Sequence, residues 1–178
     1  MNIREILDLK IGGQWLVSPA ARETIFCREM FSDEHKDIEK MIFDFAGEKI
    51  YPNIQKIEAL DEDLSRSIMK DMGALGLIGV DTPEKYGGTE LDKITACIVT
   101  EGVGFGGSSS FGCTFGVQTG IGSLGIVFFG TPEQKSKYLP KLMKGEWVAA
   151  YGLTEPSSGS DALSAKTTAV LSEDGKDY

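Results

Sequence analysis

Hydrophobic residues recur at helical intervals in the first half of the chain. From residue 31 onward, apolar side chains repeat every three or four positions, at Ile38, Met41, Ile42 and Phe45. This spacing places side chains on one face of an amphipathic helix. Ser32 precedes the repeat as a capping hydroxyl, and Pro52 follows it. The pattern predicts a helix that begins after Ser32 and ends before Pro52.

Two further helical segments are expected before residue 80. The segment from Pro52 to Leu60 predicts a short helix. Asp61 or Asp63 then supplies a capping carboxylate for another helix, which continues through apolar positions to Met72. The pattern fades over residues 73–79, where three glycines interrupt it. We therefore expect three helices in this part of the chain.

Residues 91–101 fit either a helix or a buried strand. The apolar positions 91, 94, 97 and 98 have helical spacing, but residues 94–100 also have the composition of a buried strand. The next segment, Gly102–Gly107, matches the G-x-G-x-x-G pattern of dinucleotide-binding folds. That fold needs an acidic residue about 20 positions after the glycines. After Glu101 the next carboxylate is Glu133, so we expect helices between residues 90 and 130.

The clearest helix start lies at residues 131–134. Thr131 is a capping hydroxyl, Pro132 occupies the first helical position, and Gln134 is the third residue of the turn. Together they form a capping box. The sequence predicts a helix from this point to about Met143.

The pattern changes to short β-prone segments after Gly145. Residues 147–151 and 166–171 favour strands, and Asp174–Gly175 is typical of a hairpin turn. The chain ends at Tyr178, before the returning strand is complete. We expect an extension over residues 1–30, a helical domain over 31–145, and the truncated start of a β domain over 146–178, all from a longer protein.

Charge and composition exclude several classes of protein. The chain has 27 acidic and 18 basic residues, a net charge of −9 and a pI of about 4.7. No global field attracts nucleic acid or an anionic membrane surface. No run of about 18 apolar residues predicts a membrane span, and no signal peptide is evident at the N-terminus. The sequence therefore favours a folded protein of the cytoplasm.

The cysteines and the histidine offer no catalytic or metal-binding arrangement. Cys27, Cys97 and Cys113 are odd in number and unevenly spaced, so neither a disulfide framework nor a metal site is expected. We interpret them as small core residues in a reducing compartment. His35 is the single histidine and lies at a charged helix start, where we expect a solvated side chain. A histidine-based nucleophile is not expected.

Glycine is in excess over one part of the chain. Nine of the 22 glycines lie between Gly102 and Gly125. Each helical glycine lowers stability by up to about 1 kcal/mol relative to alanine. Such a loss indicates that backbones must approach closely here, or that small side chains leave an apolar groove for a ligand.

The most specific candidate for chemistry is the segment from Tyr151 to Asp161. It leaves a predicted strand and carries four serine and threonine hydroxyls and two glycines. Exposed backbone N–H groups and hydroxyls are suited to binding a polar ring system and a phosphate. An ordinary turn rich in serine and glycine is the alternative.

Several motifs along the chain resemble those of the acyl-CoA dehydrogenases. The flavin-binding signature of that family is matched by Leu153-Thr154-Glu155-Pro156-x-x-Gly159-Ser160-Asp161. Flanking matches are Phe129-Gly130-Thr131-x-x-Gln134-Lys135-x-x-Tyr138-Leu139-Pro140 and Leu75-Gly76-Leu77-Ile78-Gly79-Val80. The resemblance spans about residues 33–178. The Pro156-Ser157-Ser158-Gly159 variant is most similar to the very-long-chain members.

The resemblance implies a mainly α fold and an FAD cofactor. The family has an N-terminal helical domain, a middle β domain and a C-terminal four-helix domain, of which this chain would contain the first and the opening of the second. By the family pattern, Tyr151, Leu153 and Thr154 lie at the flavin ring. Gly159 and Ser160 belong to the same cradle, and Ser160 also lies near the CoA part of the substrate.

The resemblance also implies the reaction. Such enzymes oxidise an acyl-CoA by removing an α-proton and transferring a β-hydride to flavin. The catalytic base is a glutamate of the C-terminal domain, so no catalytic residue is expected here and the chain alone should be inactive. The implied electron acceptor is an electron-transferring flavoprotein. Dimers or tetramers are expected, in the cytoplasm or, in a eukaryote, the mitochondrial matrix.

In long-chain members of the family the acyl tail lies beside the helix that corresponds to residues 116–129. The resemblance therefore implies that Gly120 and Gly122 bind substrate by leaving room for a long tail, and that Gly125 does the same. Two alternatives remain open: a relative that acts as an acyl-CoA oxidase or flavin monooxygenase, and a non-catalytic helical interaction module.

Overall fold

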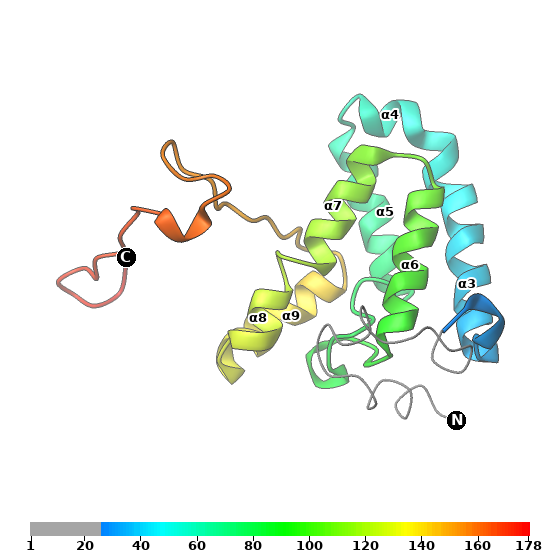
Figure 1. Ribbon diagram of the computed structural model, residues 1–178, viewed down its shortest axis with the longest axis horizontal. Helices are drawn as coiled ribbons and strands as arrows, with labels where there is room; N and C mark the ends of the chain where they lie inside the picture. Colours follow the sequence, from blue (N-terminus) through cyan, green and yellow to red (C-terminus); the bar gives the residue numbers. More distant parts are fainter. Residues whose placement is uncertain (1–25) are drawn as a thin grey trace, which may run out of the picture.

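The computed structural model describes residues 26–178 as a bundle of helices followed by an irregular C-terminal segment (Figure 1). The helices are α3 (Asp33–Phe45), α4 (Ile54–Glu58), α5 (Glu62–Ala74), α6 (Lys93–Phe105), α7 (Ser109–Thr119), α8 (Leu124–Phe129) and α9 (Pro132–Met143). Within the described residues no strand forms, which confirms a mainly α fold. Most of the expected extension over residues 1–30 lies outside the described part of the chain.

The start of α3 confirms the predicted cap but corrects the interpretation of His35. The backbone N–H of His35 donates to Ser32 Oγ at 3.1 Å, and the Ser32 N–H donates to His35 Nδ1 at 3.3 Å. The imidazole therefore completes a capping box in place of the usual Glu or Gln. His35 is 7% exposed, so the expectation of a solvated side chain was wrong.

The burial of His35 is explained by Asp92, the N-cap of α6. His35 Nε2 lies 3.1 Å from Asp92 Oδ2. Because Nδ1 accepts a hydrogen bond, the ring proton is on Nε2 and is donated to Asp92. Burial raises the pKa of Asp92, but hydrogen bonds from the N–H and hydroxyl of Thr95, together with His35, hold that pKa below its usual range. One carboxylate thus caps α6 and orients the first turn of α3.

The next helices begin and end near the predicted positions. After α3 the chain continues through a π-helical turn, η3 (Ala46–Ile50), and a 3₁₀ turn, η4 (Tyr51–Asn53), before α4. Of the two candidate caps for α5, the structure selects Asp61, whose carboxylate accepts from Leu64 N at 3.0 Å. The ambiguous stretch after residue 91 is helical, so Gly102–Gly107 forms the end of α6 and a turn rather than a nucleotide-binding loop.

The core lies where α3, α5, α6, α7 and α9 meet. α3 packs along α6 (Figure 1), and a Cβ at Gly102 would lie only 2.5 Å from Ile42 Cγ1, so this glycine permits the close approach of the two helices. α5 approaches the end of α9 in the same way, because a Cβ at Gly73 would overlap the backbone of Lys144. The largest fully buried apolar side chains are Phe111, Ile42, Ile50, Met69, Met72, Leu139, Met143, Val99 and Val103.

The cysteines do not lie in this core. Cys27, Cys97 and Cys113 are free and exposed, so the interpretation of them as core residues was wrong. α6 buries Thr95, Ile98 and Val99. A helix turns by about 100° per residue, so position 97 lies off the face that positions 95, 98 and 99 share.

The first turn of α9 forms the predicted capping box. Gln134 N–H donates to Thr131 Oγ1 at 3.3 Å, and Thr131 N–H donates to Gln134 Oε1 at 2.8 Å. Thr131→Ala should lower the free energy of unfolding by about 1 kcal/mol, because the Gln134 N–H loses the hydroxyl that accepts its hydrogen bond. Urea denaturation with an unchanged slope measures this loss. Ser136→Ala, at an exposed position of the same helix, should stay within about 0.5 kcal/mol of the parent; equal losses in the two variants would contradict the prediction.

α4 and α7 are joined through Glu58. Its carboxylate accepts from Ser108 Oγ at 2.7 Å, from Ser110 Oγ at 2.5 Å and from Ser110 N at 3.2 Å. These bonds, the Ser110 hydroxyl first, hold the pKa of Glu58 below its usual range. The carboxylate therefore stabilises the turn that begins α7.

This arrangement predicts a specific pH dependence. The pKa of Glu58 is lower in the folded than in the unfolded chain, so its contribution is present above the ordinary carboxyl pKa of about 4.3 and is lost as the pH falls through the folded value. Glu58→Gln should therefore be less stable than the parent at pH 7, and the two should converge in acid. Thermal melts from pH 7 to pH 3 measure the difference. Glu48→Gln, at an exposed position of η3, should stay within about 0.5 kcal/mol of the parent at pH 7; parallel curves for Glu58→Gln and the parent would contradict the assignment.

The predicted strands after Gly145 do not form within the described residues. A turn closes between Ser172 and Asp177, with Ser172 N donating to Asp177 O at 2.8 Å and Gly175 in the left-handed region. The turn expected at Asp174–Gly175 is present, but segments 147–151 and 166–171 remain irregular, so the strand assignments were wrong for this structure. A strand needs a neighbouring strand with which its backbone can pair, and these segments have none within the described part of the chain.

One stretch of the described residues is long enough and apolar enough to cross a membrane. It is Ser109–Phe129, 21 residues that include α7 and α8. The core helices of soluble proteins can have the same length and composition, so this property alone does not indicate a membrane span. The helix also breaks within it, since α7 ends at Thr119 and α8 begins at Leu124.

Candidate functional site

Residues 147–149, which follow α9, are hydrogen-bonded to the helices. Gln118, near the end of α7, is fully buried, and its side-chain nitrogen donates to Leu142 O at 2.8 Å and to Trp147 O at 3.1 Å. Its side-chain oxygen accepts from Ala149 N at 2.6 Å. One amide thus connects α7, the end of α9 and the start of the C-terminal segment.

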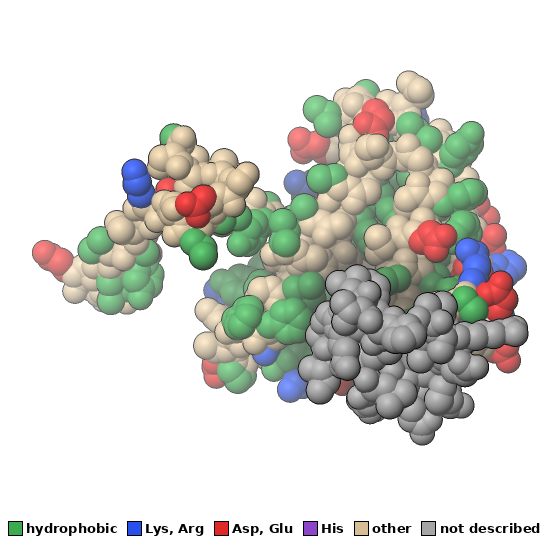
Figure 2. All heavy atoms as spheres, in the orientation of Figure 1, with side chains coloured by type: hydrophobic (Ala, Val, Ile, Leu, Met, Phe, Trp, Pro, Cys, Tyr) green, Lys and Arg blue, Asp and Glu red, His purple; other side chains and the backbone are tan. Residues whose placement is uncertain are grey.

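Beyond Ala149 the predicted flavin-binding residues are open to solvent. Tyr151 is 56% and Leu153 is 47% exposed, and Thr154 is exposed as well. In Figure 1 this part of the chain runs away from the helical bundle, and Figure 2 shows hydrophobic side chains at its surface. Aromatic, aliphatic and hydroxyl groups are therefore presented together on one short stretch.

The remaining predicted residues lie in a turn that is closed by its own hydrogen bonds. Glu155 accepts from the backbone N–H groups of Lys166 at 2.7 Å and Thr167 at 3.0 Å. Hydrogen bonds from Thr167 and Lys166 hold the pKa of Glu155 below its usual range. Ser158 is buried and donates to Asp161 O at 2.7 Å. The loop is therefore shaped within residues 155–167.

Gly159 and Ser160 lie on the open side of this turn. Both are exposed, and a Cβ at Gly159 would meet nothing within 4 Å. A ligand can therefore approach the backbone at Gly159 closely, and the exposed Ser160 is the next residue. The structure thus brings Tyr151, Leu153 and Thr154 onto one segment, and Gly159 and Ser160 onto the adjoining turn.

A broad groove adjoins the start of this segment. It has a volume of about 660 Å³, and its lining combines hydroxyls of α7 with apolar groups of the C-terminal segment: Ser109, Ser110, Cys113, Thr114, Val117, Val148, Ala149, Ala150 and Tyr151. A flavin has an apolar ring face and polar edges, so an apolar wall bordered by hydroxyl and N–H donors fits it. The residues present are therefore compatible with FAD.

The two glycines predicted to bind substrate have close neighbours. A Cβ at Gly120 would lie 2.6 Å from Gly116 O, and one at Gly122 would lie 2.6 Å from Ala149 Cβ and 2.8 Å from Val117 O. A side chain at position 120 would therefore clash within the turn that ends α7. A side chain at position 122 would clash with the C-terminal segment. At Gly125 a Cβ would meet nothing within 4 Å. Leucine at position 120 or 122 would therefore disturb the local backbone even without a substrate.

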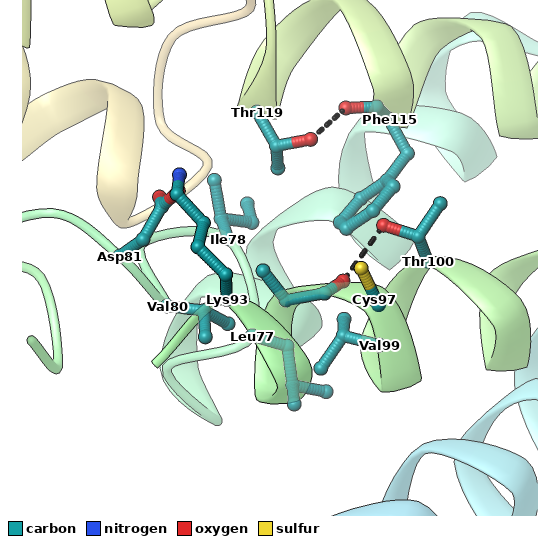
Figure 3. A pocket seen from close by; sticks show the side chains of 11 residues that line it. Leu77, Ile78, Val80, Asp81, Lys93, Cys97, Val99, Thr100, Phe115 and Thr119 are labelled. Atoms are coloured by element: carbon teal, nitrogen blue, oxygen red, sulfur yellow. Dashed lines mark hydrogen bonds and ion pairs between the residues drawn. The ribbon is translucent and has the colours of Figure 1, made fainter. Parts of the chain in front are cut away.

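A second pocket, which the sequence did not reveal, lies between the loop after α5, α6 and α7 (Figure 3). It has a volume of about 320 Å³, with apolar walls that include Leu77, Val80 and Phe115. Lys93 and Asp81 form an ion pair at this pocket. Its residues come from three separate segments, so no local pattern could have indicated it. In the described residues no cluster of potential metal ligands occurs.

Comparison with protein families identifies the helical part of the chain. Residues 32–146 match the family model "Acyl-CoA dehydrogenase, N-terminal domain". The chain belongs to the acyl-CoA dehydrogenase family. The predicted family and its N-terminal helical domain are thereby confirmed, and the family is FAD-dependent.

Individual acyl-CoA dehydrogenases agree with this assignment. A probable acyl-CoA dehydrogenase of Bacillus subtilis is 47% identical over 175 residues, which are 98% of this chain and 29% of the relative. The human mitochondrial very long-chain specific acyl-CoA dehydrogenase is 46% identical over 125 residues, 69% of this chain and 18% of that protein. The crystal structure of an acyl-CoA dehydrogenase complexed with FAD from Bacillus anthracis has a TM-score of 0.86 and 47% identity, over 92% of this chain and 28% of that one.

The chain therefore spans less than a third of the length of these dehydrogenases. It corresponds to the helical domain and to the segment that carries the flavin motif. The domain boundaries, with a helical domain over 31–145, stay a prediction.

Proposed function

We propose that this chain is the N-terminal part of an FAD-dependent acyl-CoA dehydrogenase that oxidises an acyl-CoA to the trans-2-enoyl-CoA. The observation that carries the proposal is the exposed 151–160 segment. It presents the family's flavin motif directly after a helical domain of that family. Membership of the FAD-dependent family supports the cofactor.

Five residues of the segment would hold the cofactor. Tyr151, Leu153 and Thr154 would contact the flavin ring, because they combine apolar surface with a hydroxyl on one exposed stretch. Gly159 and Ser160 would face the pyrophosphate, because the backbone is open at Gly159 and the hydroxyl of Ser160 is exposed. When bound, FAD supplies the hydride acceptor.

The role of this chain in the reaction is to bind and orient. Thr154 could donate a hydrogen bond to a polar edge of the ring, and Tyr151 and Leu153 would exclude water from its face. Ser160 would also contact the CoA part of the substrate. The base that takes the α-proton is expected from a glutamate of the family's C-terminal domain, so this chain alone should be inactive.

The substrate is proposed to be a long-chain acyl-CoA, and the reaction a step of fatty acid β-oxidation. The supporting observations are the Pro156-Ser157-Ser158-Gly159 variant and the similarity to the human very long-chain enzyme. An electron-transferring flavoprotein is the proposed electron acceptor, and a homo-oligomer the proposed assembly. The proposed location is the cytoplasm, or the mitochondrial matrix in a eukaryote.

Anaerobic titration of the full-length protein tests this function. The protein should purify with FAD, and a long-chain acyl-CoA should bleach the visible flavin absorption. Slow reoxidation in air and rapid reoxidation by electron-transferring flavoprotein would distinguish a dehydrogenase from an acyl-CoA oxidase or a flavin monooxygenase. A protein that binds neither FAD nor acyl-CoA would contradict the proposal and favour the interaction module.

A further inference from the structure

We propose that Gln118 is a positioning residue for the flavin-binding segment. It holds residues 147–149 against the helical domain, and the cofactor-binding residues 151–160 extend from that fixed point. This inference rests on the proposed function. Gln118 is not predicted to touch the flavin, so its effect would be exerted through the backbone that it binds.

The amide of Gln118 satisfies three backbone groups from two different parts of the chain. It donates to Leu142 O at the end of α9 and to Trp147 O in the C-terminal segment, and it accepts from Ala149 N in the same segment. Only a primary amide offers two donors and an acceptor on one planar group. Its complete burial makes each of these bonds hard to replace with water.

A second contact holds the same segment from the α7–α8 turn. Gly122 lies so close to Ala149 that a Cβ at position 122 would be 2.6 Å from Ala149 Cβ. The backbone of residue 149 is therefore bonded by Gln118 and packed against Gly122. These two contacts come from one corner of the helical domain and act on the same residue.

Trp147 fixes the other end of the attachment. The backbone N–H of Trp147 donates to Lys141 O at 3.2 Å. The centroid of the indole ring lies 6.2 Å from that of the Tyr138 ring and 4.4 Å from the Lys141 ammonium. Tyr151 follows Ala149 by two residues, and a residue advances an extended chain by no more than about 3.6 Å. A displaced Ala149 would therefore move the first flavin-binding side chain directly.

The test uses the full-length protein and three variants. Gln118→Met keeps the length of the side chain but removes all three hydrogen bonds. Gln118→Glu keeps the acceptor for Ala149 but places a carboxylate oxygen against the carbonyls of Leu142 and Trp147. Thr95→Val is the matched control, because it removes a buried hydrogen bond to Asp92 at the start of α6 and leaves the bonds of Gln118 intact.

Two quantities are measured: the dissociation constant of FAD, and the amide hydrogen exchange of peptides that cover residues 147–151. Both Gln118 variants should raise the dissociation constant by about tenfold, the equivalent of losing one or two hydrogen bonds. Both should also accelerate exchange in these peptides. Thr95→Val should lower the melting temperature while leaving the FAD dissociation constant and this exchange unchanged.

The outcomes separate this role from the proposed function. If the Gln118 variants melt earlier but bind FAD as tightly as the parent, the residue is structural and the positioning role is overturned. If the parent protein binds no FAD, the proposed function fails, and the positioning role fails with it. Should the Gln118 variants not fold, Gly122→Ala tests the same point, because its Cβ displaces Ala149 and should weaken FAD binding with Gln118 intact.

Discussion

Gly73→Ala should destabilise the protein by about 3 kcal/mol, near the upper end of the range for an overpacked core. The added Cβ would overlap the backbone carbonyl of Lys144, where the end of α9 lies against α5. A backbone contact cannot be relieved by a change of rotamer, so the two helices must separate. For a chain of this length the melting temperature should fall by roughly 6–12 °C, which differential scanning calorimetry can measure.

The control for this prediction is the same substitution at an open helical position. Gly104 lies in α6 and is exposed, and a Cβ added there would meet no atom within 4 Å. Gly104→Ala should therefore raise stability by up to about 1 kcal/mol, from helix propensity alone. The same added methyl group should therefore lower the stability of the protein at position 73 and raise it at position 104. A Gly73→Ala protein as stable as the parent would show that α5 and α9 do not pack as closely as described.

Gly125→Leu in the full-length protein should reduce kcat/KM for long-chain acyl-CoA by about 10- to 200-fold, the range set by unfavourable contacts in an apolar pocket. Activity toward a four-carbon acyl-CoA should change little, because a short tail would not reach the part of the helix at residues 116–129 that contains Gly125. Gly125 is the informative position, since a Cβ there meets nothing within 4 Å whereas Gly120 and Gly122 have close neighbours. Steady-state kinetics over a series of chain lengths measures the shift.

Gly112→Leu provides the matched control for this variant. Gly112 lies in α7, also has no neighbour within 4 Å of a Cβ, and precedes the helix segment proposed to border the acyl tail. Its chain-length profile should match that of the parent. A parent enzyme most active on four-carbon substrates, or identical profiles for Gly112→Leu and Gly125→Leu, would refute the proposal that a long acyl tail lies beside residues 116–129.

The helices were largely predictable because their signals are local. Ser32, Asp61 and Thr131 each cap the helix that the sequence assigned to them. The capping hydroxyl or carboxylate and the N–H that it accepts from are only three residues apart, so both are visible in a short stretch of sequence. Residues 91–101 were ambiguous for the opposite reason: β-branched residues are acceptable in a buried helix when tertiary packing supports it.

Long-range contacts explain what the sequence did not reveal. The burial of His35 depends on Asp92, which is 57 residues away. Residues 166–171 have strand composition but no neighbouring strand to pair with within residues 26–178, so composition alone gave the wrong assignment. The flavin motif could be recognised from its own residues, whereas the attachment through Gln118 could not, because its partners lie 24 to 31 positions further along the chain.

The carboxylate of Asp92, which binds the first turns of both α3 and α6, also affects how these two helices unfold. Helix ends ordinarily fray independently of one another. Here Asp92 caps the first turn of α6 and accepts a hydrogen bond from the imidazole that caps the first turn of α3. Opening either turn removes a partner from the other, so the two helix starts should unravel together as one cooperative event.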